Sequence, residues 1–360
     1  MRRFTTLCSS LLALLQLLLV LHLVAQVAAD LITALTDQEI EELALLSKPE
    51  RLEPDGEFLA PFLVKRVPGT EGNRQVQKFI LEQGKKLGWF IETDSFTQDT
   101  PMGSIDFTNI ILTKHPQAPA RLVLAAHFDS KYFAPGPADF IGATDSAVPC
   151  ALLFDLAFSL DHYLDQFTDP YTTVQLIFFD GEEAFVGADP NDFIWGSKHL
   201  AAYWERPTLF PATPSAVPYK TPLEHIDLMV LLDLIGAPAP IFNDYFANTS
   251  DYFHALAGLE SRLIKLFLVS RHKSYFKTDR QFVGGIIDDH VPFVQRNIPV
   301  LHLIPHPFPK VWHTTKDDAD ALDHLVIHDF SILMRVFVAS YLKAHPTPAP
   351  SISKMSPRLR

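Results

Sequence analysis

Short, continuous hydrophobic runs alternate with helical hydrophobic patterns along most of the chain. Four runs carry almost no polar residue, which is typical of strands that are covered on both faces. These runs are Arg121–Ala126, Val174–Phe179, Ile226–Leu232 and Pro299–Ile304, and Phe107–Thr113 is expected to add an antiparallel neighbour. Alternation of this kind is how βα units appear in a sequence. We therefore predict a single α/β domain with a mostly parallel, mixed central sheet flanked by helices.

Three segments have the hydrophobic period of an α-helix. They are Arg74–Leu87, Ala147–Leu160 and Leu325–Leu342. The second is almost wholly apolar, so it is expected to be central and buried.

The two ends of the chain differ from the part between them. Basic residues at the start precede the leucine-rich run Leu11–Val24 and the small residues Val27-Ala28-Ala29, a pattern typical of a secretory signal. We predict a signal peptide over residues 1–29, a catalytic domain over 30–344 and a flexible, proline-rich tail over 345–360. A retained signal anchor in a Golgi membrane is the alternative, although Gln16 and His22 interrupt the apolar run.

A secretory signal predicts that the protein is secreted or resides in the lumen of the secretory pathway. Asn248-Thr249-Ser250 is an N-glycosylation sequon, which in that pathway implies a surface position for Asn248.

Composition narrows the class of partner. The chain is 48% hydrophobic and 20% charged, as in folded domains, and its formal net charge is −12. This acidity argues against binding to nucleic acid, and we expect no stable membrane contact if the leader is cleaved. A peptide or small molecule is the expected partner. The only cysteines are Cys8 and Cys150, so any metal must be held by histidines and carboxylates.

Polar residues of the metal-binding type follow the predicted strands, where α/β sheets bind their ligands. The stretches concerned are His127-Phe128-Asp129, Asp180-Gly181-Glu182-Glu183, Asp233, and His302 with Trp312-His313-Thr314, while Asp145 precedes the apolar helix. Each has a structural reading on its own: Asp145 as a helix cap, Glu182 and Glu183 as acidic residues at a helix start, and the histidines as hydrogen-bonded core or loop residues. Their convergence on one sheet edge favours a zinc site instead.

These segments together resemble the glutaminyl-peptide cyclotransferases, or glutaminyl cyclases, which are relatives of the zinc-dependent aminopeptidases. The likeness runs from about Arg66 to the terminal helix and rests on an ordered set of stretches. They are Pro68–Asn73, Ala126–Lys131, Gly142–Cys150, Phe178–Phe185, Leu231–Pro238, Asp288–Phe293 and His302–Thr314. The resemblance implies a zinc exopeptidase-like fold.

The resemblance also implies roles for individual residues. Asp145, Glu183 and His313 would hold one zinc ion per chain, and Glu182 would transfer the proton. Asp233 and Asp288, helped by His302, would form a hydrogen-bonded network beside them. The implied reaction converts N-terminal glutamine of a peptide, and slowly N-terminal glutamate, to pyroglutamate.

Zinc would polarise the γ-carbonyl, and the substrate's own α-amine would attack it. Ammonia leaves when the substrate is glutamine. Trp312 and Phe308 are expected to form apolar walls that exclude water from the reacting groups.

Two positions depart from the family pattern. Ala188 stands where an aromatic residue is expected, which would alter substrate affinity. Cys150 matches one cysteine of a family disulfide, but Ala126 occupies the position of its partner, so that bridge is expected to be absent.

Two other functions fit parts of the sequence. A two-zinc aminopeptidase would use His127 and Asp233 for a second metal, with Asp145 bridging both ions. A non-catalytic binding ectodomain on the same fold would be expected to lose metal ligands, whereas the predicted ligands are all present. Three stretches favour the cyclase: Asp288-Asp289-His290, His302-Leu303-Ile304-Pro305 and Trp312-His313-Thr314.

Overall fold

The computed structural model describes residues 26–133, 140–167, 170–186, 191–207, 221–270, 273–281 and 284–344. The predicted leader up to residue 25, Cys8, Ala188 and the predicted tail from residue 345 lie outside the described residues. Residues 26–33 are helical, and Leu31 within this helix is fully buried.

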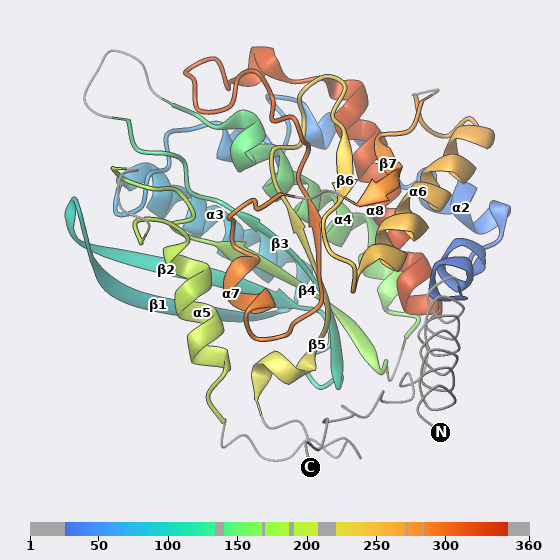
Figure 1. Cartoon of the computed structure of the whole chain (residues 1–360), viewed down its shortest axis with the longest axis horizontal. Coiled ribbons are helices and arrows are strands. Elements are labelled where there is room, and N and C mark those ends of the chain that lie inside the picture. Colours follow the sequence, from blue (N-terminus) through green and yellow to red (C-terminus); the bar gives the residue numbers. More distant parts are fainter. Residues whose placement is uncertain are drawn as a thin grey trace, which may run out of the picture.

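A six-stranded mixed sheet forms the centre of the molecule, in the order β1-β2-β4-β3-β5-β8 (Figure 1). Strands β3, β4, β5 and β8 are parallel to one another, whereas β2 runs antiparallel to both β1 and β4. The strand bounds are β1 Phe90–Thr100, β2 Gly103–Thr113, β3 Ala120–His127, β4 Thr172–Phe179, β5 Ile226–Leu232 and β8 Val300–Leu303, and a separate pair joins β6 Phe242–Asp244 to β7 Phe276–Gln281. The predicted mixed sheet and its antiparallel neighbour are confirmed.

Helices cover both faces of the sheet. The α-helices are α2 Asp37–Ala44, α3 Glu71–Leu87, α4 Val148–Leu164, α5 Trp195–Trp204, α6 Ser250–Lys265, α7 Val291–Val294 and α8 His324–Ala344. Side chains of β3 alternate between the two faces. Leu122 and Leu124 belong to the larger core with α3, α4 and α8, whereas Val123 and Ala125 pack in the core beneath α5 and α7.

The two most apolar helices are core helices. Segments Ala143–Leu164 and His324–Ala344 are long and apolar enough to cross a membrane, but 89% of each apolar window is buried inside the protein. The predicted burial of the Ala147–Leu160 segment is confirmed, because α4 packs on β3 and against α8. Helix α3 begins after the N-cap Thr70 and ends at Gly88, which adopts the left-handed conformation that favours glycine.

Parallel order places the carboxyl ends of β3, β4, β5 and β8 at one edge of the sheet. The residues that follow these strands therefore meet there, together with the loop that leads into α4.

Candidate active site

Asp145, Glu183 and His313 come together at this sheet edge. The His313 Nε2 atom lies 3.5 Å from Asp145 Oδ2 and 3.4 Å from Glu183 Oε1. Three ligand atoms held about 2.0–2.2 Å from a tetrahedral zinc ion lie about 3.3–3.6 Å apart. The two separations from His313 therefore match those of a zinc site, and all three ligand atoms lie within 4.8 Å of one another.

The hydrogen bonding of these side chains also fits a metal. Both Asp145 Oδ2 and Glu183 Oε1 are buried, and neither has a hydrogen-bond partner among the described residues. A buried carboxylate oxygen without a partner is costly unless a cation balances it. The other oxygen of Glu183 accepts a 3.1 Å hydrogen bond from Lys131 Nζ, which leaves Oε1 directed to the shared site.

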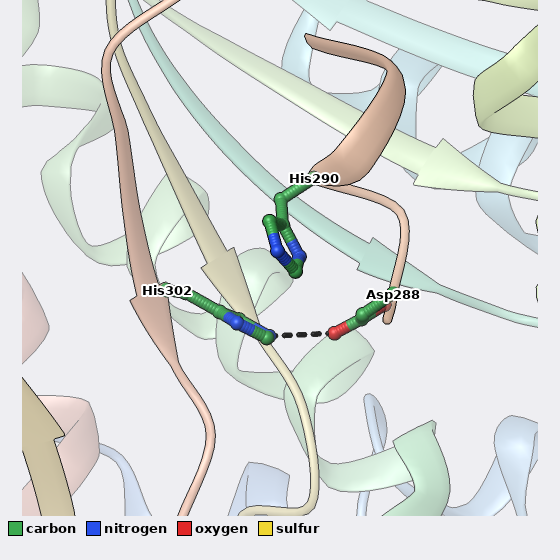
Figure 2. Close-up of side chains that lie close together, drawn as sticks. All are labelled: Asp288, His290 and His302. Carbon is green, nitrogen blue, oxygen red and sulfur yellow. Dashed lines mark hydrogen bonds and ion pairs between the residues drawn. The ribbon is translucent and has the colours of Figure 1, made fainter. Parts of the chain in front are cut away.

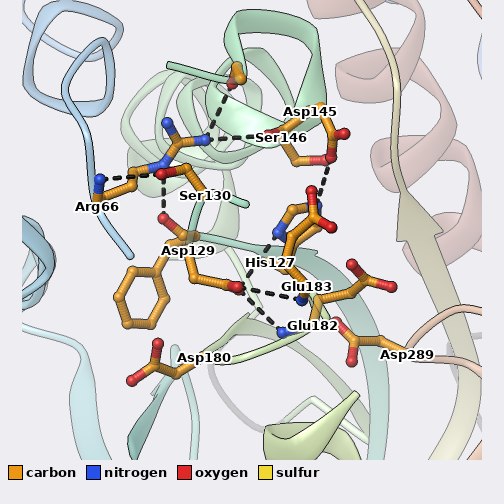
Figure 3. A network of polar contacts seen from close by, with 12 residues as sticks. Arg66, His127, Asp129, Ser130, Asp145, Ser146, Asp180, Glu182, Glu183 and Asp289 are labelled. Atoms are coloured by element: carbon orange, nitrogen blue, oxygen red, sulfur yellow. Dashed lines mark hydrogen bonds and ion pairs between the residues drawn. The ribbon is translucent and has the colours of Figure 1, made fainter. Parts of the chain in front are cut away.

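The loop that carries Asp145 is held by a buried arginine. Arg66 is fully buried, and its guanidinium donates to the carbonyl oxygens of Ile141, Gly142 (3.0 Å) and Asp145 (3.3 Å), and to Phe128 at the end of β3 (2.6 Å) (Figure 3). The planar guanidinium of Arg66 thus links the end of β3 to the loop that carries Asp145.

The same loop makes a close turn at Gly142. Its φ angle is +63°, and a Cβ atom here would lie 2.2 Å from the carbonyl oxygen of Asp145. Only glycine meets both conditions without distortion. From the other side, Asp317 Oδ1 accepts a 2.8 Å hydrogen bond from the amide of Thr144.

Asp129 fixes the adjacent acids Glu182 and Glu183. Its carboxylate accepts hydrogen bonds from both their backbone amides, at 3.0 Å and 3.2 Å (Figure 3). Glu183 turns to His313, whereas the half-buried Glu182 lines the same pocket as a separate carboxylate. The two neighbours are therefore placed for different tasks.

The two acids also differ electrostatically. Burial raises the pKa of Glu182 well above its usual range, and the nearby Glu183, Asp288 and Asp289 carboxylates raise it further. Burial acts in the same direction on Glu183, but His313, Lys131 and His127 outweigh it and lower its pKa to about 2. Glu182 is therefore suited to carry a proton, and Glu183 to remain an anion.

His127 and Asp233 lie beside Asp145 in a second candidate metal group. His127 Nε2 is 3.1 Å from Asp145 Oδ1 and 3.6 Å from Asp233 Oδ1. Here the oxygens already have partners, because Asp233 Oδ1 accepts from the Ser146 hydroxyl and from the Leu234 amide at 2.8 Å. This bonding favours a structural role for the pair.

Asp288 and His302 form a third buried group with His290 (Figure 2). His302 Nε2 lies 2.7 Å from Asp288 Oδ2, and burial lowers the pKa of His302 to about 4, so its ring is neutral. Among the described residues Asp288 has no hydrogen bond to Asp233. Asp288 therefore pairs with His302, and Asp233 pairs with Ser146, instead of the two aspartates bonding to each other.

A cavity of about 280 Å³ opens onto the predicted ligands. Phe308 and Trp312 form part of its wall, with their ring centroids 4.8 Å apart, and Trp312 stacks on His313 at 4.0 Å. His313 itself has a φ angle of +53°, which is uncommon for a residue with a side chain. The backbone is thus held in a strained conformation where His313 meets the acids.

Several supporting residues have no role in the sequence-based prediction. These are Arg66, Asp129, Lys131, Ser146 and Asp317. Asp129 carries a usable signal, because it follows the same strand as His127. The guanidinium of Arg66 donates hydrogen bonds to backbone carbonyls, and no sequence pattern predicts such contacts.

Cys150 is a free, buried thiol that donates to the His127 carbonyl at 3.1 Å, and Ala126 on β3 stands at the position of the expected partner cysteine. Asn248 is exposed in the turn before α6.

The fold and this acid-rich site are those of a metallopeptidase-like enzyme, and the sequence model of peptidase family M28 matches residues 109–338. The bovine glutaminyl-peptide cyclotransferase-like protein is 43% identical over 88% of this chain and 82% of its own length. The glutaminyl-peptide cyclotransferase of Drosophila melanogaster is 40% identical over 80% of each chain. The crystal structure of Macrostomum lignano glutaminyl cyclase superposes with a TM-score of 0.75 at 38% identity, covering 86% of this chain and 94% of that one.

The chain belongs to the glutaminyl-peptide cyclotransferase family. It is therefore an enzyme of that family rather than a non-catalytic ectodomain.

Proposed function

We propose that the protein converts N-terminal glutamine of peptides to pyroglutamate with release of ammonia, using one zinc ion. The main observation behind this proposal is that two buried carboxylate oxygens without hydrogen-bond partners, Asp145 Oδ2 and Glu183 Oε1, lie close to His313. Zinc bound there would act as a Lewis acid toward the γ-carbonyl of the substrate.

Glu182 is the proposed proton carrier. The α-amine of the substrate attacks its own γ-carbonyl carbon, a C–N bond forms, and the bond to the side-chain nitrogen breaks. Glu182 accepts the proton from the amine and returns it to the leaving nitrogen, which departs as ammonia. A raised pKa suits this task, because the group must both gain and release a proton near neutral pH.

The remaining residues bind and orient. Asp233 lines the pocket with Asp145 and would accept a hydrogen bond from the substrate amine. Asp288, paired with His302, adds negative charge behind Glu182. Phe308 and Trp312 cover the apolar side of the folded glutamine side chain and exclude water.

The number of metal ions separates this function from that of an aminopeptidase. His127, Asp145 and Asp233 offer a second set of donors, but Asp233 Oδ1 already accepts hydrogen bonds from the Ser146 hydroxyl and the Leu234 amide. We therefore propose one zinc per chain, with His127 as a structural partner of Asp145.

The cellular setting is part of the same proposal. Residues 1–29 are proposed to direct the chain into the secretory pathway, where it is released or retained by an uncleaved leader in a Golgi membrane. The exposure of Asn248 supports glycosylation there.

One experiment tests the activity directly. The purified, zinc-loaded protein is incubated with a peptide that begins with glutamine and another that begins with leucine, with and without a zinc chelator, and both are followed by mass spectrometry. Chelator-sensitive loss of one ammonia from the glutamine peptide alone supports the cyclase. Release of leucine identifies an aminopeptidase. If the mass of neither peptide changes, both activities are contradicted.

A further inference from the structure

A second, outer pocket adjoins the cavity of the candidate active site. Its volume is about 500 Å³, and it shares Ile286, Phe308 and Trp312 with the inner cavity. Because these three side chains line both spaces, the outer pocket is where a peptide chain leaving the inner cavity would run. This inference rests on the proposed function, in which the N-terminal residue occupies the inner cavity.

The charges of the two pockets are opposite in kind. Four carboxylates and one lysine line the inner cavity: Asp145, Glu182, Glu183 and Asp233, with Lys131 paired to Glu183. The residues that line the outer pocket include no carboxylate, and their one permanent cation is Lys310. In a chain with a net charge of −12, a cationic pocket without acids is a local exception.

Lys310 is available for a ligand. Its side chain is exposed, and it makes no ion pair with the described residues. It therefore offers three hydrogen-bond donors and a positive charge toward a carboxylate.

The loop that carries Lys310 is anchored at its start and closed by a turn. The His306 amide donates to the Ile241 carbonyl at 2.8 Å, and Asn243 Nδ2 donates to the His306 carbonyl at 3.2 Å. Further along, the Trp312 amide donates to the Pro309 carbonyl at 3.0 Å. Prolines restrict the backbone here, so the base of the lysine is held in place while its long side chain is free to adjust.

Peptide geometry sets the positions that Lys310 can contact. An extended chain advances about 3.3–3.6 Å per residue, so the two residues after the glutamine cover a path of about 7 Å. In the proposed function the amino group of the substrate lies among the inner carboxylates, and the following side chains reach the cationic outer pocket. We propose that Lys310 makes the enzyme select peptides with an acidic residue at the second or third position.

The test compares substrates that differ only in charge. Gln-Glu-Ala-amide is paired with Gln-Gln-Ala-amide, and Gln-Ala-Glu-amide with Gln-Ala-Gln-amide. The amide caps remove the terminal carboxylate. Because an exposed ion pair contributes little free energy, we expect kcat/KM to favour the glutamate member of at least one pair by about twofold to fivefold. The preference should shrink when the salt concentration is raised from about 0.02 M to about 0.5 M.

Variants then assign the preference to one residue. Lys310→Met should reduce the ratio of the two kcat/KM values to about one, and Lys310→Glu should invert it. The matched control is Lys316→Met, which removes an exposed lysine that lines neither pocket and should leave the ratio unchanged.

The outcomes separate this proposal from the proposed function. If no glutamine peptide is cyclised by the wild type, the proposed function has failed. If every peptide is cyclised but the ratio is one in the wild type, or survives in Lys310→Met, the role of Lys310 is wrong while the cyclase activity stands.

Discussion

The inner and outer pockets are built in different ways. The inner acids are fixed by buried hydrogen bonds: Arg66 donates to backbone carbonyls, and Asp129 and Asp317 accept from backbone amides. The outer pocket is lined by exposed side chains such as His306, Lys310 and Trp312, the last of which is 39% exposed. The proposed chemistry thus depends on a rigid, buried scaffold, whereas the proposed contact with the rest of the peptide depends on the surface. Substitutions in the two regions should therefore change different kinetic constants.

Glu182→Gln should produce the largest effect on turnover. The amide keeps the shape of the side chain but cannot exchange a proton, and general acid–base catalysis contributes about 10²–10⁴-fold. We expect kcat to fall within that range while zinc stays bound. Steady-state kinetics and the zinc content of the same preparation provide the measurement. Loss of zinc from this variant would mean that Glu182 is itself a ligand.

Glu183→Gln is the counterpart, with its main effect on the metal. The substitution removes the anionic oxygen that lies 3.4 Å from His313 Nε2. Zinc affinity should be measured by competition with a chelator. It should fall by more than the roughly 10–100-fold loss that follows removal of a residue that only hydrogen-bonds to a metal ligand. Equal zinc loss in Glu182→Gln and Glu183→Gln would reverse our assignment of the two acids.

Arg66→Lys tests whether the scaffold behind the ligands matters. Lysine has three donors where the guanidinium has five, so it would leave some carbonyls near Asp145 unpaired. We expect zinc affinity to weaken by about tenfold or more, as for other residues that orient a ligand. The control is Arg74→Lys, at an exposed arginine paired with Glu71 at 3.1 Å.

A second readout separates positioning from simple destabilisation in Arg66→Lys. The unfolding midpoint is measured without metal, alongside the zinc affinity. A lower midpoint with unchanged zinc affinity would show that Arg66 only stabilises the fold.

The sequence was a good guide to the parallel strands because they are buried on both faces. Val174–Phe179 and Ile226–Leu232 contain little but apolar residues, and the structure has strands over nearly the same ranges. Since parallel strands end at one edge, the acids after them could be expected to meet. The convergence of these acids is therefore the part of the site that can be predicted from the sequence.

Other features leave no such trace. Strand β1 lies at the sheet edge and is mostly polar and solvent-exposed, so its hydrophobic signal is weak. The position of β3 between β4 and β5 depends on how the helices pack, which no single segment encodes. Arg66 lies far along the chain from Asp145, and its partners are carbonyls that every residue possesses.

Trp312→Ala should have the smallest effect of the four substitutions and should act mainly on KM. The ring lines both pockets and is already partly exposed, so its removal loses about 1 kcal/mol of contact, or about fivefold in KM. Zinc affinity should stay near that of the wild type, because the scaffold around Asp145 does not include this ring. Tyr203→Ala, at a 50% exposed aromatic residue on α5, is the control and should leave KM unchanged. A large fall in zinc affinity in Trp312→Ala would break the division between the pockets, because it would mean that the stacking of Trp312 on His313 holds the ligand in place.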